Sequence, residues 1–170
     1  MKAEDLRAIQ APIKQRYRDD AATALIPARA EGELQIDGIA CNVKIWKGGH
    51  TLAGLHPAGG GSGAEACSAD MLLEALVGCA GVTLAAVATA MSIPIRGGKV
   101  IAEGTWDARG TLGVDRAAPV GITDIKLTFE VDTDADSEKI ARMVQMAERY
   151  CVIAQTLQHP PKITFEHRAV

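Results

Sequence analysis

The stretch "DMLLEALVGCAGVTLAAVATAMSIPI", residues 70–95, decides the fold, because its residues 75–95 carry no charge at all. A run of this length raises the question of a membrane-spanning helix. The run is, however, rich in alanine and glycine, contains several hydroxyl side chains, and is interrupted by Pro94. We therefore interpret residues 69–91 as a buried helix that ends before the proline, and we expect no membrane association.

Apolar residues recur along this helix at intervals of 4, 3, 3 and 4 residues, which places them on one face. Much of the opposite face is apolar as well, so we expect the helix to be buried on most sides. Ser68 occupies the expected N-cap position, and Asp70 lies in the first turn, where the helix dipole favours negative charge. The residues on the predicted face are Leu72, Leu76, Cys79, Val82 and Ala86.

The rest of the chain predicts an α+β fold with mostly antiparallel sheet, in a single domain over residues 1–170. Residues 1–25 read as an N-terminal helical extension. Asp37-Gly38 separates two strand-like runs and is a strong hairpin signal. The expected elements are a helix at 3–18, strands at 28–36 and 39–46, a loop at 47–67, strands at 99–107 and 122–132, helices at 136–149 and 151–157, and a last strand at 162–167.

Composition and charge exclude several classes of function. The chain has 48% hydrophobic residues and a net charge of −3, which argues against a basic surface for nucleic acid. The first twenty residues are strongly charged and contain no apolar core of a secretory signal, so we expect a cytoplasmic protein with reduced thiols. The glycine-rich loop lacks the endings that bind phosphates or dinucleotides, and the cysteines lack metal-site spacing. We therefore expect neither a cofactor nor a metal.

Four cysteines remain as candidate reactive groups. Cys79 lies in the middle of the apolar helix, and periodicity alone favours a packing role for it, because free cysteine is among the most buried residue types. Cys151 stands where one helix leads into a short second one, near backbone N–H donors that would favour its thiolate. Cys41 reads as a sheet-face residue. Cys67, at the mouth of the helix, reads as a surface or half-buried loop thiol, and the alternative is that it is a second resolving partner for Cys79.

Two segments resemble the OsmC/Ohr family over about residues 28–168. The apolar helix is similar to the family's central helix, which has Gly-Cys or Ala-Cys at its middle, as in Gly78-Cys79 here. "ERYCVIAQTL", residues 148–157, resembles the family's second segment, where a helix leads into a cysteine and a short helix. The resemblance implies an intertwined α+β homodimer with two sites at the dimer interface.

The resemblance also implies roles for individual residues. Cys79 would be the peroxidatic thiol and Cys151 the resolving thiol. Arg29, near the first strands, is similar in place to an arginine that holds the peroxidatic thiolate in the peroxidase branch. That branch has a Pro-Glu pair at the start of the helix, where this chain has Ser68 and Ala69. Asp70, one step further on, would stand in for the glutamate that orients the arginine.

Three functions follow from these observations. The first is a thiol-dependent peroxidase that reduces organic hydroperoxides in oxidative-stress defence and is recycled by an external dithiol reductant. The second is a non-catalytic module that binds a hydrophobic ligand at the dimer interface, which the missing Pro-Glu pair favours. The third is a hydrolase that uses Cys151 and His159, although no oxyanion motif accompanies them.

Overall fold

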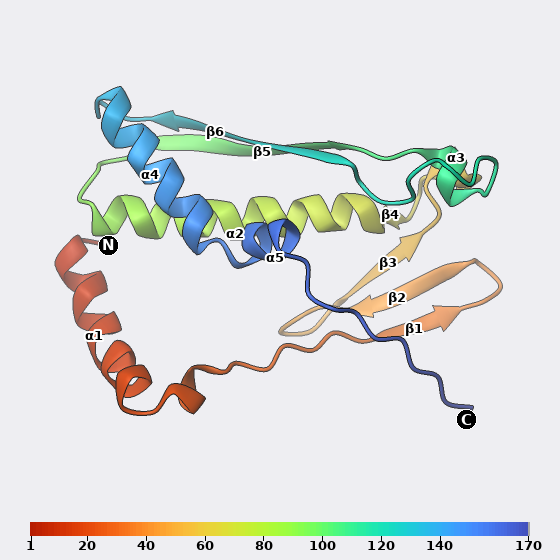
Figure 1. The fold of residues 1–170 in the computed structure, drawn as a ribbon, viewed down its shortest axis with the longest axis horizontal. Helices are drawn as coiled ribbons and strands as arrows, with labels where there is room; N and C mark the ends of the chain where they lie inside the picture. Colours follow the sequence, from red (N-terminus) through yellow and green to blue (C-terminus); the bar gives the residue numbers. More distant parts are fainter. Residues whose placement is uncertain (170) are drawn as a thin grey trace.

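A long central helix organises the computed structural model, which describes residues 1–169. A two-stranded antiparallel ribbon runs along one side of this helix, and two shorter helices cross a neighbouring side (Figure 1). The central helix is α2 (Ser68–Ala90), the ribbon strands are β5 (Gly97–Thr105) and β6 (Asp124–Asp132), and the crossing helices are α4 (Ser137–Tyr150) and α5 (Val152–Gln158).

The N-terminal part of the chain forms a second, four-stranded sheet in the order β1-β2-β3-β4. The first two pairings are antiparallel and the β3–β4 pairing is parallel. Most of this sheet extends away from α2, and α1 lies at the opposite end of the molecule (Figure 1). The elements are α1 (Ala3–Asp19), η1 (Ala21–Ala24), β1 (Gly32–Gln35), β2 (Ala40–Lys44), β3 (His50–Gly54), η2 (Pro57–Gly59) and β4 (Ala66–Cys67).

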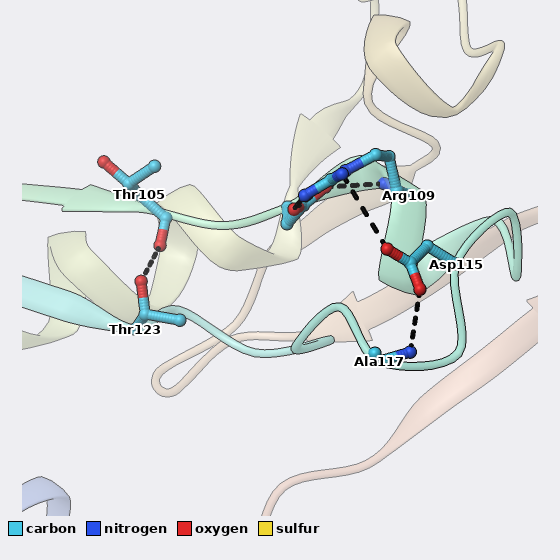
Figure 2. Close-up of polar contacts among 6 residues, drawn as sticks. Thr105, Arg109, Asp115, Ala117 and Thr123 are labelled. Carbon is cyan, nitrogen blue, oxygen red and sulfur yellow. Dashed lines mark hydrogen bonds and ion pairs between the residues drawn. The ribbon is translucent and has the colours of Figure 1, made fainter.

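The connection between β5 and β6 is a structured loop containing the short helix α3 (Ala108–Thr111). Arg109 is held in it by Asp107, at 2.6 Å, and by Asp115, at 3.8 Å. The Thr123 hydroxyl donates to the Thr105 carbonyl at 3.3 Å and ties the two strand ends together (Figure 2). Arg109 thus forms ion pairs with two carboxylates of its own loop.

The α+β class, the mainly antiparallel pairing and the first hairpin are confirmed. Asp37 and Gly38 are the central residues of a tight turn, in which the Ile39 N–H donates to the Ile36 carbonyl at 3.2 Å. The adjacent pair Gln35↔Ala40 sets the strand register. The helices predicted at 3–18, 69–91, 136–149 and 151–157 are all present within one or two residues of the expected bounds.

Two predictions about strands are wrong. The expected loop at 47–67 contains β3 and β4, because His50–Gly54 pairs with β2 although its sequence does not alternate. The strand expected at 162–167 is not formed, and its apolar residues Ile163 and Phe165 are 71% and 92% exposed. An alternating segment becomes a strand only beside another strand, and this segment pairs with none in the single chain.

The buried face of α2 agrees with the predicted one at Leu76 but not along its length. Leu76, Ala80 and Leu84 are at most 5% exposed, because β5, α4 and α5 pack on that side. On the predicted face, Val82 is 73% exposed and Leu72 is 39% exposed. The helix is therefore covered on one side only. Its start is also shifted by one residue, since Cys67 is the N-cap and makes no side-chain capping bond.

By length and composition alone, α2 is long and apolar enough to cross a membrane, a test that core helices of soluble proteins also pass. Within the single chain, only 28% of its most apolar 18-residue window is buried. Much of the apolar surface of α2 is therefore left uncovered in the single chain.

Candidate active site

The corner between α4 and α5 positions Cys151 over the middle of α2. Met143 and Ala147 of α4 are at most 1% exposed and belong to the core, and Met143 and Leu84 of α2 share one buried cluster. Cys151 follows α4 directly, is itself 1% exposed, and packs against Leu76 and Ala80. The apolar stripe of α4 therefore holds this thiol against the central helix.

Cys151 also joins the two helices through hydrogen bonds. Its N–H donates to the Ala147 carbonyl at 2.9 Å and so ends α4. Its side chain is the N-cap of α5, where Sγ accepts a hydrogen bond from the Ala154 N–H at 3.5 Å. The predicted position of Cys151 at a helix start, beside a backbone N–H donor, is confirmed. The expectation that this position favours its thiolate is wrong, because burial raises the pKa of Cys151.

Cys79 is half-buried in the same cluster, so the structure brings the two cysteines together. Burial raises the pKa of the Cys79 thiol, but hydrogen bonding lowers it further than burial raises it, and the pKa lies below its ordinary value. The hydrogen-bonding groups, in decreasing order of effect, are the Ile153 N–H, the Cys151 thiol, the Val152 N–H and the Thr83 hydroxyl.

This environment supplies donors rather than a positive charge. Backbone groups of Val152 and Ile153, at the start of α5, are among the causes that lower the pKa of Cys79 despite its mid-helix position. The Thr83 hydroxyl donates to the Cys79 carbonyl at 2.7 Å. No cation is among the groups that shift the pKa of Cys79 in one chain.

The Cys151 thiol is perturbed in the opposite direction. Burial raises its pKa, and the neighbouring Cys79 sulfur raises it further, while the Ala154 N–H only partly offsets both effects. The net pKa of Cys151 lies above its ordinary value. Cys79 is therefore the thiol that ionises first, and Cys151 is the one that remains protonated beside it.

The structure does not bring the other two predicted site residues to Cys79. The Arg29 side chain is 83% exposed and pairs with Glu31 at 2.7 Å, and Arg29 is not among the groups that shift the pKa of Cys79. Asp70 is exposed in the first turn of α2. It lies nine residues before Cys79, about 14 Å along the helix axis. Their proposed roles remain predictions.

The alternative cysteine pairings find no support within one chain. Cys67 precedes Cys79 by twelve residues of continuous helix, about 18 Å along the axis, whereas a disulfide requires Cα atoms within about 7 Å. Cys41 lies on β2, where its sulfur packs over Gly32. His159 sits at the far end of α5 from Cys151, and its Nδ1 is 3.3 Å from the Gln155 carbonyl, so the hydrolase geometry is absent.

A cavity of about 520 Å³ beside Cys151 is the feature that sequence reasoning missed. Its walls come from β6, α4, α5 and α2, and Cys151 is among its lining residues whereas Cys79 is not. The alternation of Ile125, Leu127 and Phe129 along β6 is the signal that predicts one apolar wall. Within residues 1–169, no group of three or more His, Cys, Asp or Glu could hold a metal ion.

Solved structures share this fold at low sequence identity. An OsmC-like protein from Mycoplasma pneumoniae is 18% identical, with a TM-score of 0.65, covering 79% of this chain and 89% of its own. An organic hydroperoxide resistance protein from Elizabethkingia anophelis is 14% identical, with a TM-score of 0.63, covering 80% and 91%. An OsmC-like protein of unknown function from Vibrio cholerae is 14% identical, with a TM-score of 0.61, covering 78% and 94%.

A search among curated proteins found no match. The model of the OsmC-like protein family, in contrast, matches residues 60–166, a span that contains α2, the β5–β6 ribbon and both cysteines of the candidate site. This span is well over half of the chain, and the sequence match agrees with the fold of the solved structures. The chain therefore belongs to the OsmC-like family.

Proposed function

We propose that the protein is a thiol-dependent peroxidase that reduces organic hydroperoxides through Cys79 and Cys151. The observation that carries the proposal is the asymmetry of two adjacent thiols. Hydrogen bonds lower the pKa of Cys79, whereas burial raises the pKa of Cys151. One sulfur is thereby prepared as a nucleophile, and the other stays a protonated neighbour until it is needed.

The chemistry has two balanced steps. The Cys79 thiolate attacks the distal oxygen of R–OOH, the O–O bond breaks, and the departing alkoxide takes a proton to leave as R–OH. Cys79 is then a sulfenic acid. The Cys151 sulfur displaces its hydroxyl group, which leaves as water with the Cys151 proton, and a Cys79–Cys151 disulfide forms. An external dithiol reductant restores both thiols, in a reaction that we assign to the cytoplasm.

We propose further that the active form is a homodimer. Exposed apolar residues in one chain include Val82 on α2, Leu34 on β1 and Phe165 in the 162–167 segment, and Phe165 is 92% exposed. A second copy would cover these surfaces and would pair the free strand edges. In such a dimer, Arg29 could reach Cys79 only from the second chain, because it pairs with Glu31 within its own.

Stoichiometric cumene hydroperoxide followed by peptide mapping tests the peroxidase. The wild-type protein should lose two thiols and gain a Cys79–Cys151 disulfide. Cys151→Ser should react once and stop at the sulfenic acid, since its resolving thiol is missing. Cys79→Ser should not react, and Cys41→Ser, on β2 away from the pair, should behave as wild type.

If all four thiols survive the hydroperoxide, the peroxidase proposal fails. The non-catalytic binding module then takes its place, and the apolar cavity beside Cys151 is the observation that favours it. That module should bind an aliphatic ligand with no change in the oxidation state of either cysteine. Calorimetric titration with a medium-chain alcohol would detect such binding directly.

A further inference from the structure

The N-terminal helix α1 lies outside the part of the chain that the family model matches. That match begins at residue 60, and the solved structures named above cover between 78% and 80% of this chain. Figure 1 shows α1 at one end of α2, on the side of α2 that faces away from the β5–β6 ribbon. We call residues 1–31, which comprise α1, η1 and the connection to β1, the arm. The family match does not account for this arm.

Apolar residues form a stripe along α1 that its own chain leaves partly uncovered. They recur at intervals of 3, 4 and 4 residues and share one side of the helix: Leu6, Ile9, Ile13 and Tyr17. Ile9 is 55% exposed and Ile13 is 38% exposed, and no residue of α1 is buried. The start of α1 meets the end of α2, where residues 1–3 line a cavity of about 780 Å³ together with α2 and β5. Beyond that contact, the stripe is open to another surface.

A helix of this kind needs packing to stay formed. α1 has 17 residues, and Pro12 inside it has no N–H to donate to the preceding turn. Isolated helices near this length are marginal in water, and most of the stability of helices in proteins comes from packing an apolar face. The stripe is the face of α1 that is available for such packing. We therefore expect another surface to cover it in solution.

The exposed area of the chain indicates how large that surface is. One chain exposes 12883 Å² to solvent. A compact monomer of the same mass, 17.9 kDa, would expose about 8,000 Å². The difference, roughly 5,000 Å², is more than one chain contributes to most obligate homodimer interfaces. Every residue from 18 to 39 is exposed, so the arm accounts for part of this difference. A second copy of the chain offers a surface of that size, whereas a short peptide does not.

The charge of the arm argues against a lipid surface as the partner. Residues 1–20 contain five Lys or Arg and four Asp or Glu, so this part of the arm is nearly neutral. Acidic residues occupy the first turn of α1, and basic residues occupy its last turn. Helices that lie on anionic membranes carry an excess of Lys and Arg on their polar face. The mixed charge of α1 suits a protein surface better.

We infer that α1 is a clasp, which packs its apolar stripe against a second copy of the chain. The inference rests on the homodimer of the proposed function and is independent of the peroxidase chemistry. The arm lies on the same side of α2 as most of the four-stranded sheet (Figure 1). A second copy that covers the open face of α2, which carries Val82, would thus lie between α1 and that sheet. Two-fold symmetry would make the α1 of the second copy hold the first in the same way.

Hydrogen exchange of the full-length dimer tests the clasp. Burying the exposed parts of Ile9 and Ile13 should change the opening equilibrium of α1 about 10- to 100-fold. The backbone amides of residues 14–19 should therefore exchange about 10- to 100-fold more slowly in wild type than in Ile9→Glu/Ile13→Glu. Ala8→Glu, on the opposite side of α1, is the matched control and should exchange as wild type does. Because α1 contributes no buried residue, both variants should fold, which urea unfolding checks.

Sedimentation of the same samples separates the outcomes. If the protein is a dimer and its α1 amides exchange as fast as in the double variant, the clasp is wrong and the homodimer stands. If slow exchange persists in samples that are monomeric, the chain itself covers the stripe and the clasp is again wrong. Slow exchange that requires vesicles of phosphatidylserine and phosphatidylcholine would assign the stripe to a membrane instead. A protein that is monomeric at every concentration refutes both the clasp and the homodimer, whereas the cumene hydroperoxide reaction decides the peroxidase separately.

Discussion

Replacing Val82 by aspartate tests whether a second copy covers the central helix. Val82 is 73% exposed in the single chain, and it projects from the α2 face that β5, α4 and α5 leave open. The folded monomer should therefore tolerate a carboxylate at this position. A dimer that buries the position should not, because an isologous interface contains the residue twice.

The magnitude follows from the exposed fraction. Burying a whole valine side chain contributes about 1.5–3 kcal/mol. With 73% of Val82 still exposed, about three quarters of that remains to be gained, roughly 1–2 kcal/mol per copy and 2–4 kcal/mol per dimer. The apolar loss alone should raise the dimer Kd about 30- to 1,000-fold. Desolvation of two carboxylates would add to this effect.

Sedimentation equilibrium over a concentration series gives the dimer Kd directly. The matched control is Val114→Asp, since Val114 is 74% exposed and lies in the β5–β6 connection rather than on α2. Val114→Asp should dimerise as wild type does, and urea unfolding should show that both variants fold. A wild-type protein that is monomeric at micromolar concentration, or two variants with equal Kd, would refute the reasoning.

Three other predictions use the site and the core. Cys151→Ala removes a hydrogen bond that lowers the pKa of Cys79, so alkylation of Cys79 should need a higher pH than in wild type, and Cys151→Ser, which keeps a donor, should shift the profile less. Arg29→Ala should slow Cys79 alkylation near neutral pH only if the guanidinium acts from a second chain. Unchanged alkylation kinetics would show that Arg29 does not lower the pKa of Cys79. Met143→Ala, at a position that is 0% exposed, should lose about 2–5 kcal/mol in urea unfolding, and a loss below 1 kcal/mol would contradict the assigned core.

Helix positions could be predicted from the sequence, because they depend on local pattern. The uncharged run before Pro94 predicts α2, and the Asp37-Gly38 pair predicts the first turn. That Cys79 and Cys151 meet was expected from the family resemblance, since periodicity alone favours core packing for Cys79. The roles proposed for Arg29 and Asp70 depend on groups that this chain does not bring to the thiol.

The cavity, and the opposite pKa shifts of Cys79 and Cys151, could not be predicted from the sequence for a different reason. Each arises where several elements meet, with β6, α4, α5 and α2 around the cavity and the α5 N–H groups directed at Cys79. No spacing within a single segment encodes such a junction. The short strand β3 was not predicted for a related reason. Its pairing with β2, rather than an alternating pattern of its own, makes it a strand.

The two clearest errors of the sequence predictions have the same physical cause: apolar residues predicted to be buried are exposed in the single chain. The predicted face of α2 contains Val82, and the predicted strand at 162–167 contains Phe165, and both side chains are largely exposed in the single chain. An apolar pattern records which side chains are buried in the working assembly, whereas the structure of one chain records only what that chain covers by itself. If the Val82 experiment finds a dimer, the sequence pattern correctly predicts that these two residues are buried. The error is then only the assumption that their own chain buries them. If the experiment finds a monomer, Val82 and Phe165 remain exposed in solution and the apolar pattern does not report burial at these two positions.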